Sequence, residues 1–288
     1  MIRTSIFNDE VSHNFIEALD LMDSWGQDIF DLREYIFGET VIDNISDAQR
    51  EDILQILSRY RFDIGCIGTR KLIANPDADK AEIINLLTRL IKTAKAVKTQ
   101  YIRICNFAPR PKEESLRQQM IALAIPLMKE LADITAAEGI TLLLENKPTS
   151  ITNRGSEMAD FLGRVNHPNV KAQWDVVNSW IGGYYNIESD YLDCKDFLGS
   201  VHFKGAMGKS GAFEIYDRGG VMGQDEVPHQ AVVERLVRDG FKNNITLDLA
   251  IGSINNEEFD MTRAEISRMS LEYTKKLVKD AETEFSHK

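Results

Sequence analysis

The chain of 288 residues has only three cysteines, no long apolar run and no excess of basic residues. Cys66, Cys105 and Cys194 show no CxxC spacing, so we expect reduced, buried thiols and no metal or redox role for them. No apolar run approaches the roughly 18 residues that a membrane helix needs. The amino-terminal segment lacks the basic and apolar regions of a signal peptide, so we expect a cytoplasmic protein without a membrane partner.

The formal net charge of the chain is -11. Binding to nucleic acid needs lysines and arginines gathered on one face, so the acidic balance argues against a nucleic-acid partner. An apolar fraction of 43% is enough for a sizeable core. The chain contains no linker and no low-complexity tract, and we expect residues 1–288 to form one domain.

Strand-like and helix-like segments alternate from end to end. Residues 14–25, 81–97 and 116–137 have apolar side chains at helical spacing, and in the first of them Phe15 and Leu19 share a face. Eight strands with helices between them predict the α/β class and a single (β/α)8 TIM barrel, because a chain of this length favours a closed barrel over an open sheet. The candidate strands are residues 3–7, 28–32, 62–67, 101–105, 140–145, 170–175, 199–204 and 245–250.

The last four of these strands each end near a residue that can bind a metal: Glu145, Asp175, His202 and Asp248. Singly, each has an ordinary explanation as a helix cap, an ion pair or a core histidine. Four consecutive strands bring such residues to the carboxyl end of the barrel, where active sites form. An isolated charge there would be too costly, so the pattern indicates one bound divalent ion, Mn²⁺, Mg²⁺ or Zn²⁺.

Several motifs resemble those of the xylose-isomerase-like TIM barrels, a superfamily of sugar isomerases and epimerases, and the resemblance extends over the whole chain. The motifs are LLLEN at 142–146, WDVVN at 174–178, VHFKG at 201–205, GQDEVPHQAVVERL at 223–236, ITLDL at 245–249, FNDEVS at 7–12 and FDLRE at 30–34.

The resemblance implies a divalent-metal-dependent sugar isomerase or epimerase. It assigns the metal to Glu145, Asp175 and His202, with Asp248 in the place of a usual Glu. In the family's epimerases the carboxylates at the positions of Glu145 and Asp248 form the acid–base pair, and they abstract a proton next to a carbonyl through a metal-stabilised enediolate. The implied partner is a small-molecule sugar, and a homo-oligomer, either dimer or tetramer, is common among such proteins.

Three further positions of this chain differ from those by which ketose 3-epimerases hold their sugar. Ile151, Asn178 and Gly208 stand where those enzymes usually have Glu, His and Arg. A metal-dependent lyase, dehydratase or decarboxylase acting on an oxidised sugar or sugar glycoside therefore stays open as an alternative. A DNA repair endonuclease of the same fold is disfavoured by the acidic charge, and a non-catalytic sugar-binding protein is favoured only by Asp248.

Five other polar residues are candidates for contact with the substrate. Lys204 follows His202 by two residues and so points to the same side, where it either holds a substrate oxygen or pairs with Asp175 or Asp248. Glu10 and Arg33 end the first two strands and either reach the cavity or pair with each other. A glycine-rich loop at 205–225 is a candidate lid. The five candidates are Lys204, Arg218, Glu10, Arg33 and Asn178.

Overall fold

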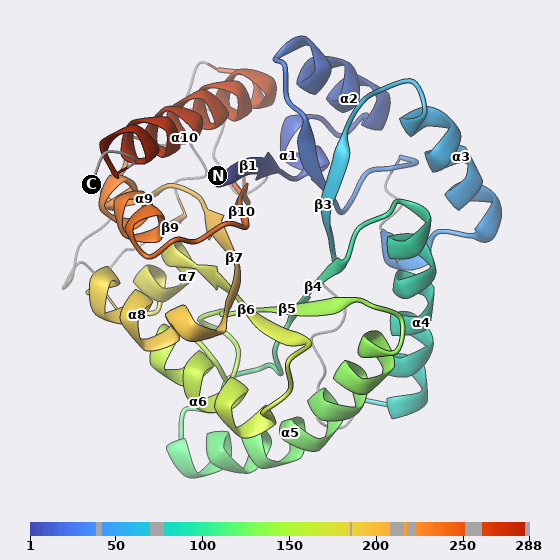
Figure 1. Cartoon of the computed structure of the whole chain (residues 1–288). Helices are drawn as coiled ribbons and strands as arrows, with labels where there is room; N and C mark the ends of the chain where they lie inside the picture. Colours follow the sequence, from blue (N-terminus) through green and yellow to red (C-terminus); the bar gives the residue numbers. More distant parts are fainter. Residues whose placement is uncertain are drawn as a thin grey trace.

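The computed structural model describes residues 1–38, 42–69, 78–184, 186–207, 216–217, 223–250 and 261–285. Eight strands form one parallel sheet with helices around it (Figure 1). They are β1 (Arg3–Ile6), β2 (Ile29–Leu32), β3 (Asp63–Gly68), β4 (Tyr101–Cys105), β5 (Thr141–Glu145), β6 (Val170–Asp175), β7 (Leu198–Phe203) and β10 (Asn244–Leu247).

The order of the strands in the sheet is β1-β10-β7-β6-β5-β4-β3-β2. One parallel bridge, between Phe7 and Asp31, joins β1 to β2 and closes the sheet into a barrel. The predicted (β/α)8 TIM barrel is therefore confirmed. All eight predicted strands are present, although β10 ends at Leu247, one residue before Asp248.

Eight longer helices cover the outside of the barrel (Figure 1). They are α2 (Phe15–Ser24), α3 (Asp47–Leu57), α4 (Lys80–Ala96), α5 (Glu114–Ala136), α6 (Gly155–Val165), α8 (Ile187–Cys194), α9 (His229–Arg238) and α10 (Arg263–Phe285). The described chain also has two short helices, α1 (Asn8–Val11) and α7 (Val176–Ile181). The remaining elements are η1 (Ile42–Asn44), η2 (Lys195–Phe197), β8 (Ala206–Met207) and β9 (Tyr216–Asp217).

Side-chain caps fix where several helices begin. The Asn14 side chain accepts a hydrogen bond from the backbone of Glu17 at the start of α2. Ser46 and Gln49 form a capping box before α3, in which each side chain bonds to the other residue's backbone N–H. Such caps satisfy N–H groups that the first helical turn leaves without partners. The predicted helices at 14–25, 81–97 and 116–137 accordingly agree with α2, α4 and α5 within two residues.

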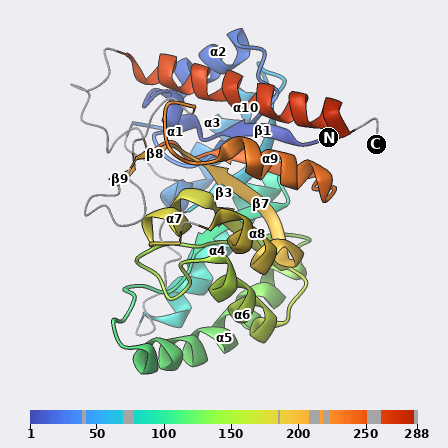
Figure 2. The same ribbon diagram turned by 90° about the vertical axis from the view of Figure 1, so that its left-hand side faces the viewer.

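The predicted lid at 205–225 lies largely outside the described residues, and so does Arg218. From that segment the structure describes β8 and β9, which pair antiparallel, and residues from Gly223 onward. Figure 2 shows β8 and β9 at one end of the barrel, and the beginning of β1 and the end of α10 at the other. In the part of the chain that is described, no helix combines the length and the apolar character needed to cross a membrane.

The inside of the barrel is polar around Asp31. This carboxylate is buried and accepts hydrogen bonds from Ser5 Oγ at 2.8 Å and Thr246 Oγ1 at 2.9 Å. Gly65 makes room for it, since a Cβ atom at Gly65 would lie 2.5 Å from Asp31 Oδ1. Burial raises the pKa of Asp31 to about 6, although the two hydroxyl donors favour the ionised form.

Replacing Asp31 with Asn should change how stability depends on pH. Because the pKa of Asp31 is higher in the folded state than the ordinary value near 4, the folded protein binds this proton more tightly. The stability that the proton contributes is present below pH 4 and is lost as the pH rises through about 6. We therefore expect the free energy of unfolding of Asp31→Asn, relative to that of the native protein, to rise by roughly 2 kcal/mol between pH 4.5 and pH 7.5.

Urea unfolding at the two pH values measures this change, because the other titrating groups are common to both proteins. An equal difference between the two proteins at pH 4.5 and pH 7.5 would contradict the raised pKa of Asp31.

Candidate metal centre

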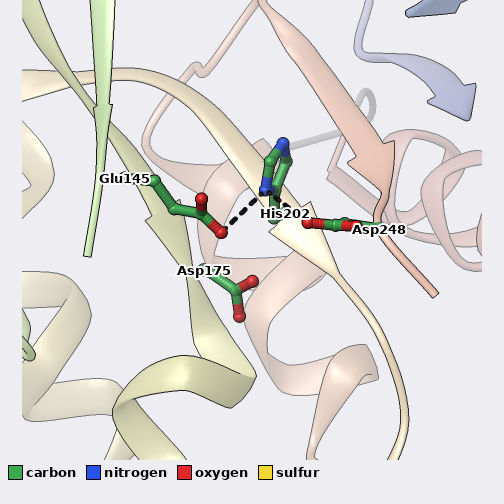
Figure 3. A group of neighbouring side chains, drawn as sticks. All are labelled: Glu145, Asp175, His202 and Asp248. Carbon is green, nitrogen blue, oxygen red and sulfur yellow. Dashed lines mark hydrogen bonds and ion pairs between the residues drawn. The ribbon is translucent and has the colours of Figure 1, made fainter. Parts of the chain in front are cut away.

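Glu145, Asp175, His202 and Asp248 converge at the carboxyl end of the barrel (Figure 3). Glu145 and Asp175 are the last residues of β5 and β6, and Asp175 is the direct partner of His202 in the pairing of β6 with β7. One nitrogen or oxygen atom from each of the four lies within 4.8 Å of those from the other three, and all four residues are buried. The four residues predicted from separate strand ends are therefore neighbours.

The imidazole of His202 is aimed at two of the carboxylates (Figure 3). Its Nδ1 atom lies 3.4 Å from Glu145 Oε1 and 3.7 Å from Asp248 Oδ2. The ring of Phe7 meets the imidazole edge-on, with 5.5 Å between ring centres, and so restricts how the imidazole can turn. The Nε2 atom of His202 is buried and has no hydrogen-bond partner among the described residues.

Two buried arginines hold the other oxygens of these carboxylates. Arg103, on β4, forms an ion pair with Glu145 Oε2, and its Nη2 atom lies 3.6 Å from Asp248 Oδ2. Arg33, just after β2, donates from Nη1 to Asp248 Oδ1 at 2.6 Å. Each of the two carboxylates thus has one oxygen bound by a guanidinium and a second that faces His202.

Arg33 is itself held on several sides. Its Nη2 atom donates to Asp9 and Glu10, both at 2.8 Å, and its guanidinium lies 4.1 Å from the centre of the Phe7 ring. Of the two alternatives for Glu10 and Arg33, the structure has the ion pair between them. Through Asp248, that pair is joined to the four clustered side chains.

The charges around the carboxylates decide their protonation. Burial alone would raise the pKa of Glu145, but Arg103, Lys147 and His202 hold it well below its usual range. Asp248 is likewise buried, and Arg33, His202 and Arg103 keep its pKa well below the usual range. Burial raises the pKa of Asp175, and Lys204 opposes this only in part. Glu145 and Asp248 are therefore ionised at neutral pH, which is the form that binds a cation.

Asn178 and Lys204 support the carboxylates from the side of β6 and β7. The backbone N–H of Asn178 donates to Asp175 Oδ1 at 2.8 Å, so that Asp175 caps α7, and the side-chain amide of Asn178 donates to Glu145 Oε1 at 3.1 Å. Lys204 donates to Asn178 Oδ1 at 3.0 Å and lies 3.2 Å from Asp175 Oδ2. The ion pair of Lys204 with Asp175, one of the two alternatives for this lysine, is therefore formed.

Two cations at this site, Arg103 and Lys147, were not predicted from the sequence. Arg103 stands in the middle of the apolar strand YIRIC, and a charged residue there was a signal that it needed buried partners. Lys147 follows Glu145 by two residues and approaches Glu145 Oε2 to 3.4 Å. Among the described residues, the other substrate-contact candidates, Glu10, Arg33, Asn178 and Lys204, all contact members of this network.

The four clustered side chains suit a divalent cation. Ligand bonds of about 2.0–2.2 Å place atoms on opposite sides of an ion about 4.4 Å apart, so a largest separation of 4.8 Å requires only a small contraction. Asp175 Oδ2 is buried and accepts no hydrogen bond of good geometry within the described residues, which leaves it available as a ligand. Three carboxylates and one imidazole are compatible with Mn²⁺, Mg²⁺ or Zn²⁺.

Comparison with known proteins supports the same family. Residues 19–277 match the family model described as xylose isomerase-like TIM barrel. A 3-dehydroshikimate dehydratase from Bacillus anthracis is 24% identical over 191 residues, which make up 66% of this chain. Those residues correspond to 62% of the dehydratase, so the chain spans less than two thirds of that relative's length.

Solved structures agree on the fold. The structure of an L-ribulose 3-epimerase has a TM-score of 0.76 and 12% identity, with 99% of this chain and 97% of that chain covered. An IolI protein with a bound zinc atom also has a TM-score of 0.76, with 18% identity and 99% of each chain covered. The predicted resemblance to xylose-isomerase-like TIM barrels is confirmed.

A double-mutant cycle on Arg103 and Glu145 tests the charge network. Arg103→Met leaves the buried carboxylate of Glu145 without its closest cation, so we expect it to destabilise the protein by about 3 kcal/mol. Glu145→Gln leaves Arg103 similarly short of a partner. The double variant should lose less than the sum of the two, with a coupling energy of about 1.5 kcal/mol or more in the free energy of unfolding from urea titrations. Additive effects would show that the pair is not coupled.

Proposed function

Because the chain belongs to the xylose isomerase-like TIM barrel family, we propose that it is a divalent-metal-dependent enzyme that isomerises or epimerises a small sugar by removing a proton next to a carbonyl group. The observation that carries the proposal is the convergence of three carboxylates and one imidazole within 4.8 Å of one another. The catalysed reactions named for an L-ribulose 3-epimerase and a 3-dehydroshikimate dehydratase, which resemble this chain, support an enzyme.

Glu145 and Asp248 are the proposed acid–base pair. They come from β5 and from the end of β10, which β6 and β7 separate in the sheet, so they approach a substrate from two sides. One carboxylate takes the proton, and the second, once it has been protonated from solvent, donates a proton to the opposite face of the carbon. Arg103 contacts both carboxylates and favours the ionised form, which the group that accepts the proton needs.

A divalent cation in the cluster would supply Lewis acidity, which makes a C–H bond next to a carbonyl more acidic. The residues that would hold it are the four clustered ones: Glu145, Asp175, His202 and Asp248. Asn178 orients two of these carboxylates through its backbone and side-chain donors. The four clustered residues are buried, which limits their contact with water.

A dehydratase or another lyase acting on an oxidised sugar is a second candidate. The 3-dehydroshikimate dehydratase that resembles this chain over 191 residues supports it. So does Ile151, which stands where ketose 3-epimerases usually carry a sugar-binding Glu and which is fully buried in the apolar core. The same proton abstraction then leads to loss of a neighbouring hydroxyl group in place of return of the proton.

Loss of a ligand should remove the metal. We expect His202→Ala and Asp175→Ala to weaken Mn²⁺ and Zn²⁺ binding by more than about a hundredfold, because each removes one of four donors from the cluster. Equilibrium dialysis with measurement of bound metal, together with titration calorimetry, gives the comparison. His167→Ala, at a histidine paired with Asp133 outside the site, is the matched control and should keep its metal. Unchanged metal content in either His202→Ala or Asp175→Ala would show that the metal is not bound by this cluster.

Glu145→Gln should stop proton abstraction while it keeps an oxygen for the cation. In D₂O, we expect the Mn²⁺-loaded protein to exchange one C–H of a ketose or 3-keto sugar with solvent, and Glu145→Gln to slow this exchange by at least about a hundredfold. NMR measures the exchange and also distinguishes an epimer from a dehydrated product, which separates the two candidate reactions. Glu113→Gln, at an exposed position, is the control. Exchange at the native rate in Glu145→Gln would show that Glu145 is not the base.

A further inference from the structure

Lys147 and Lys204 lie on the substrate side of the proposed metal centre. Each follows a clustered residue by two positions, Lys147 after Glu145 and Lys204 after His202. Because side chains alternate along an extended chain, each lysine points to the same side as that residue but nearer the carboxyl-end mouth of the barrel. Their contacts agree, since Lys147 Nζ lies 3.4 Å from Glu145 Oε2 and Lys204 Nζ lies 3.2 Å from Asp175 Oδ2.

Lys147 shares its carboxylate oxygen with a second cation. Glu145 Oε2 is already bound by Arg103, which is much closer than the lysine. The Lys147 side chain is also 28% exposed, whereas those of Arg103 and Glu145 are buried, so Lys147 is the cation of the three that a solute can reach. Because Lys147 shares Glu145 Oε2 with Arg103, its ammonium group can bind a further anion.

A bound cation would also change the surroundings of Lys204. Asp175 Oδ2 faces Lys204 and is the oxygen of Asp175 that accepts no hydrogen bond, whereas Oδ1 accepts one from the backbone of Asn178. A divalent ion held by Asp175 would compete with Lys204 for this oxygen. Lys204 would then be held less strongly by Asp175 and could donate to a substrate anion.

The charges around the cluster favour an anionic partner. Within the described residues, ion pairs join five carboxylates to five cationic side chains. A divalent ion would add two positive charges at this buried place, and a negative group that enters with the substrate would offset part of that charge. The members are Asp9, Glu10, Glu145, Asp175, Asp248, Arg33, Arg103, Lys147, Lys204 and Arg263.

We propose that Lys147 and Lys204 form an anion-binding subsite that takes a carboxylate or phosphate group of the substrate, so that the enzyme acts on a sugar acid or a sugar phosphate. This substrate class rests on the proposed function. Lys147 provides the accessible charge at the mouth, and Lys204 provides a second donor nearer the metal ligands. A carboxylate and a phosphate share the chemistry that two ammonium groups recognise.

Three compounds with the same carbon skeleton test the subsite: D-glucitol is neutral, D-gluconate carries a carboxylate and D-glucitol 6-phosphate carries a phosphate. Titration calorimetry on the Mn²⁺-loaded protein should show at least one of the anions binding about tenfold or more tightly than D-glucitol. The anion that binds more tightly identifies the group. Lys147→Met should remove most of this preference, measured as the ratio of anion affinity to D-glucitol affinity in protein loaded to the same Mn²⁺ content, and Lys147→Arg should keep it.

Lys129→Met, at an exposed lysine of α5, removes the same charge elsewhere and should keep the full preference for the anion. Equal binding of all three compounds by the native protein would overturn the subsite. A preference that persists in Lys147→Met would do the same, because the anion would then be bound without Lys147. If the native protein retains no Mn²⁺, the proposed function fails and the subsite with it, and the measurement of metal content distinguishes that outcome from the other two.

Discussion

The burial of several carboxylates in one small volume is the constraint on which this barrel depends. Glu145, Asp175 and Asp248 repel one another, and burial disfavours their charged forms. Cations from other strands offset this repulsion, above all Arg103 and Arg33, which are buried like the acids. The polar interior is therefore a single electrostatic unit in which no charge can be removed without affecting the others.

Most of the fold and the four clustered residues were predictable from the sequence. Short apolar runs marked the strands, because a parallel sheet covered by helices is buried on both faces. The polar residue at the end of each run marked the cluster, because strand order brings those ends together. The short helices α1 and α7 were not predicted, since four and six residues are too few to show helical periodicity.

The partners of the charged residues could not be predicted in the same way. Arg103 reaches Glu145 across one pair of strands, but it also reaches Asp248, which is 145 residues away in the chain. Two alternatives were left open for Lys204 and for Glu10 with Arg33, and only the packed structure shows the ion pairs that form. Sequence spacing gives the side on which a residue lies, whereas its partner depends on distances between strands.

The closure of the barrel has a consequence for how this protein can change. A single backbone bridge, from Phe7 to Asp31, joins β1 to β2, and Arg33 spans the same seam by binding Asp9, Glu10 and the face of Phe7. The same guanidinium also fixes Asp248. Arg33 thus both joins β1 to β2 and holds one of the clustered carboxylates. A substitution at this position would therefore affect the closure of the barrel and the chemistry of the cluster together.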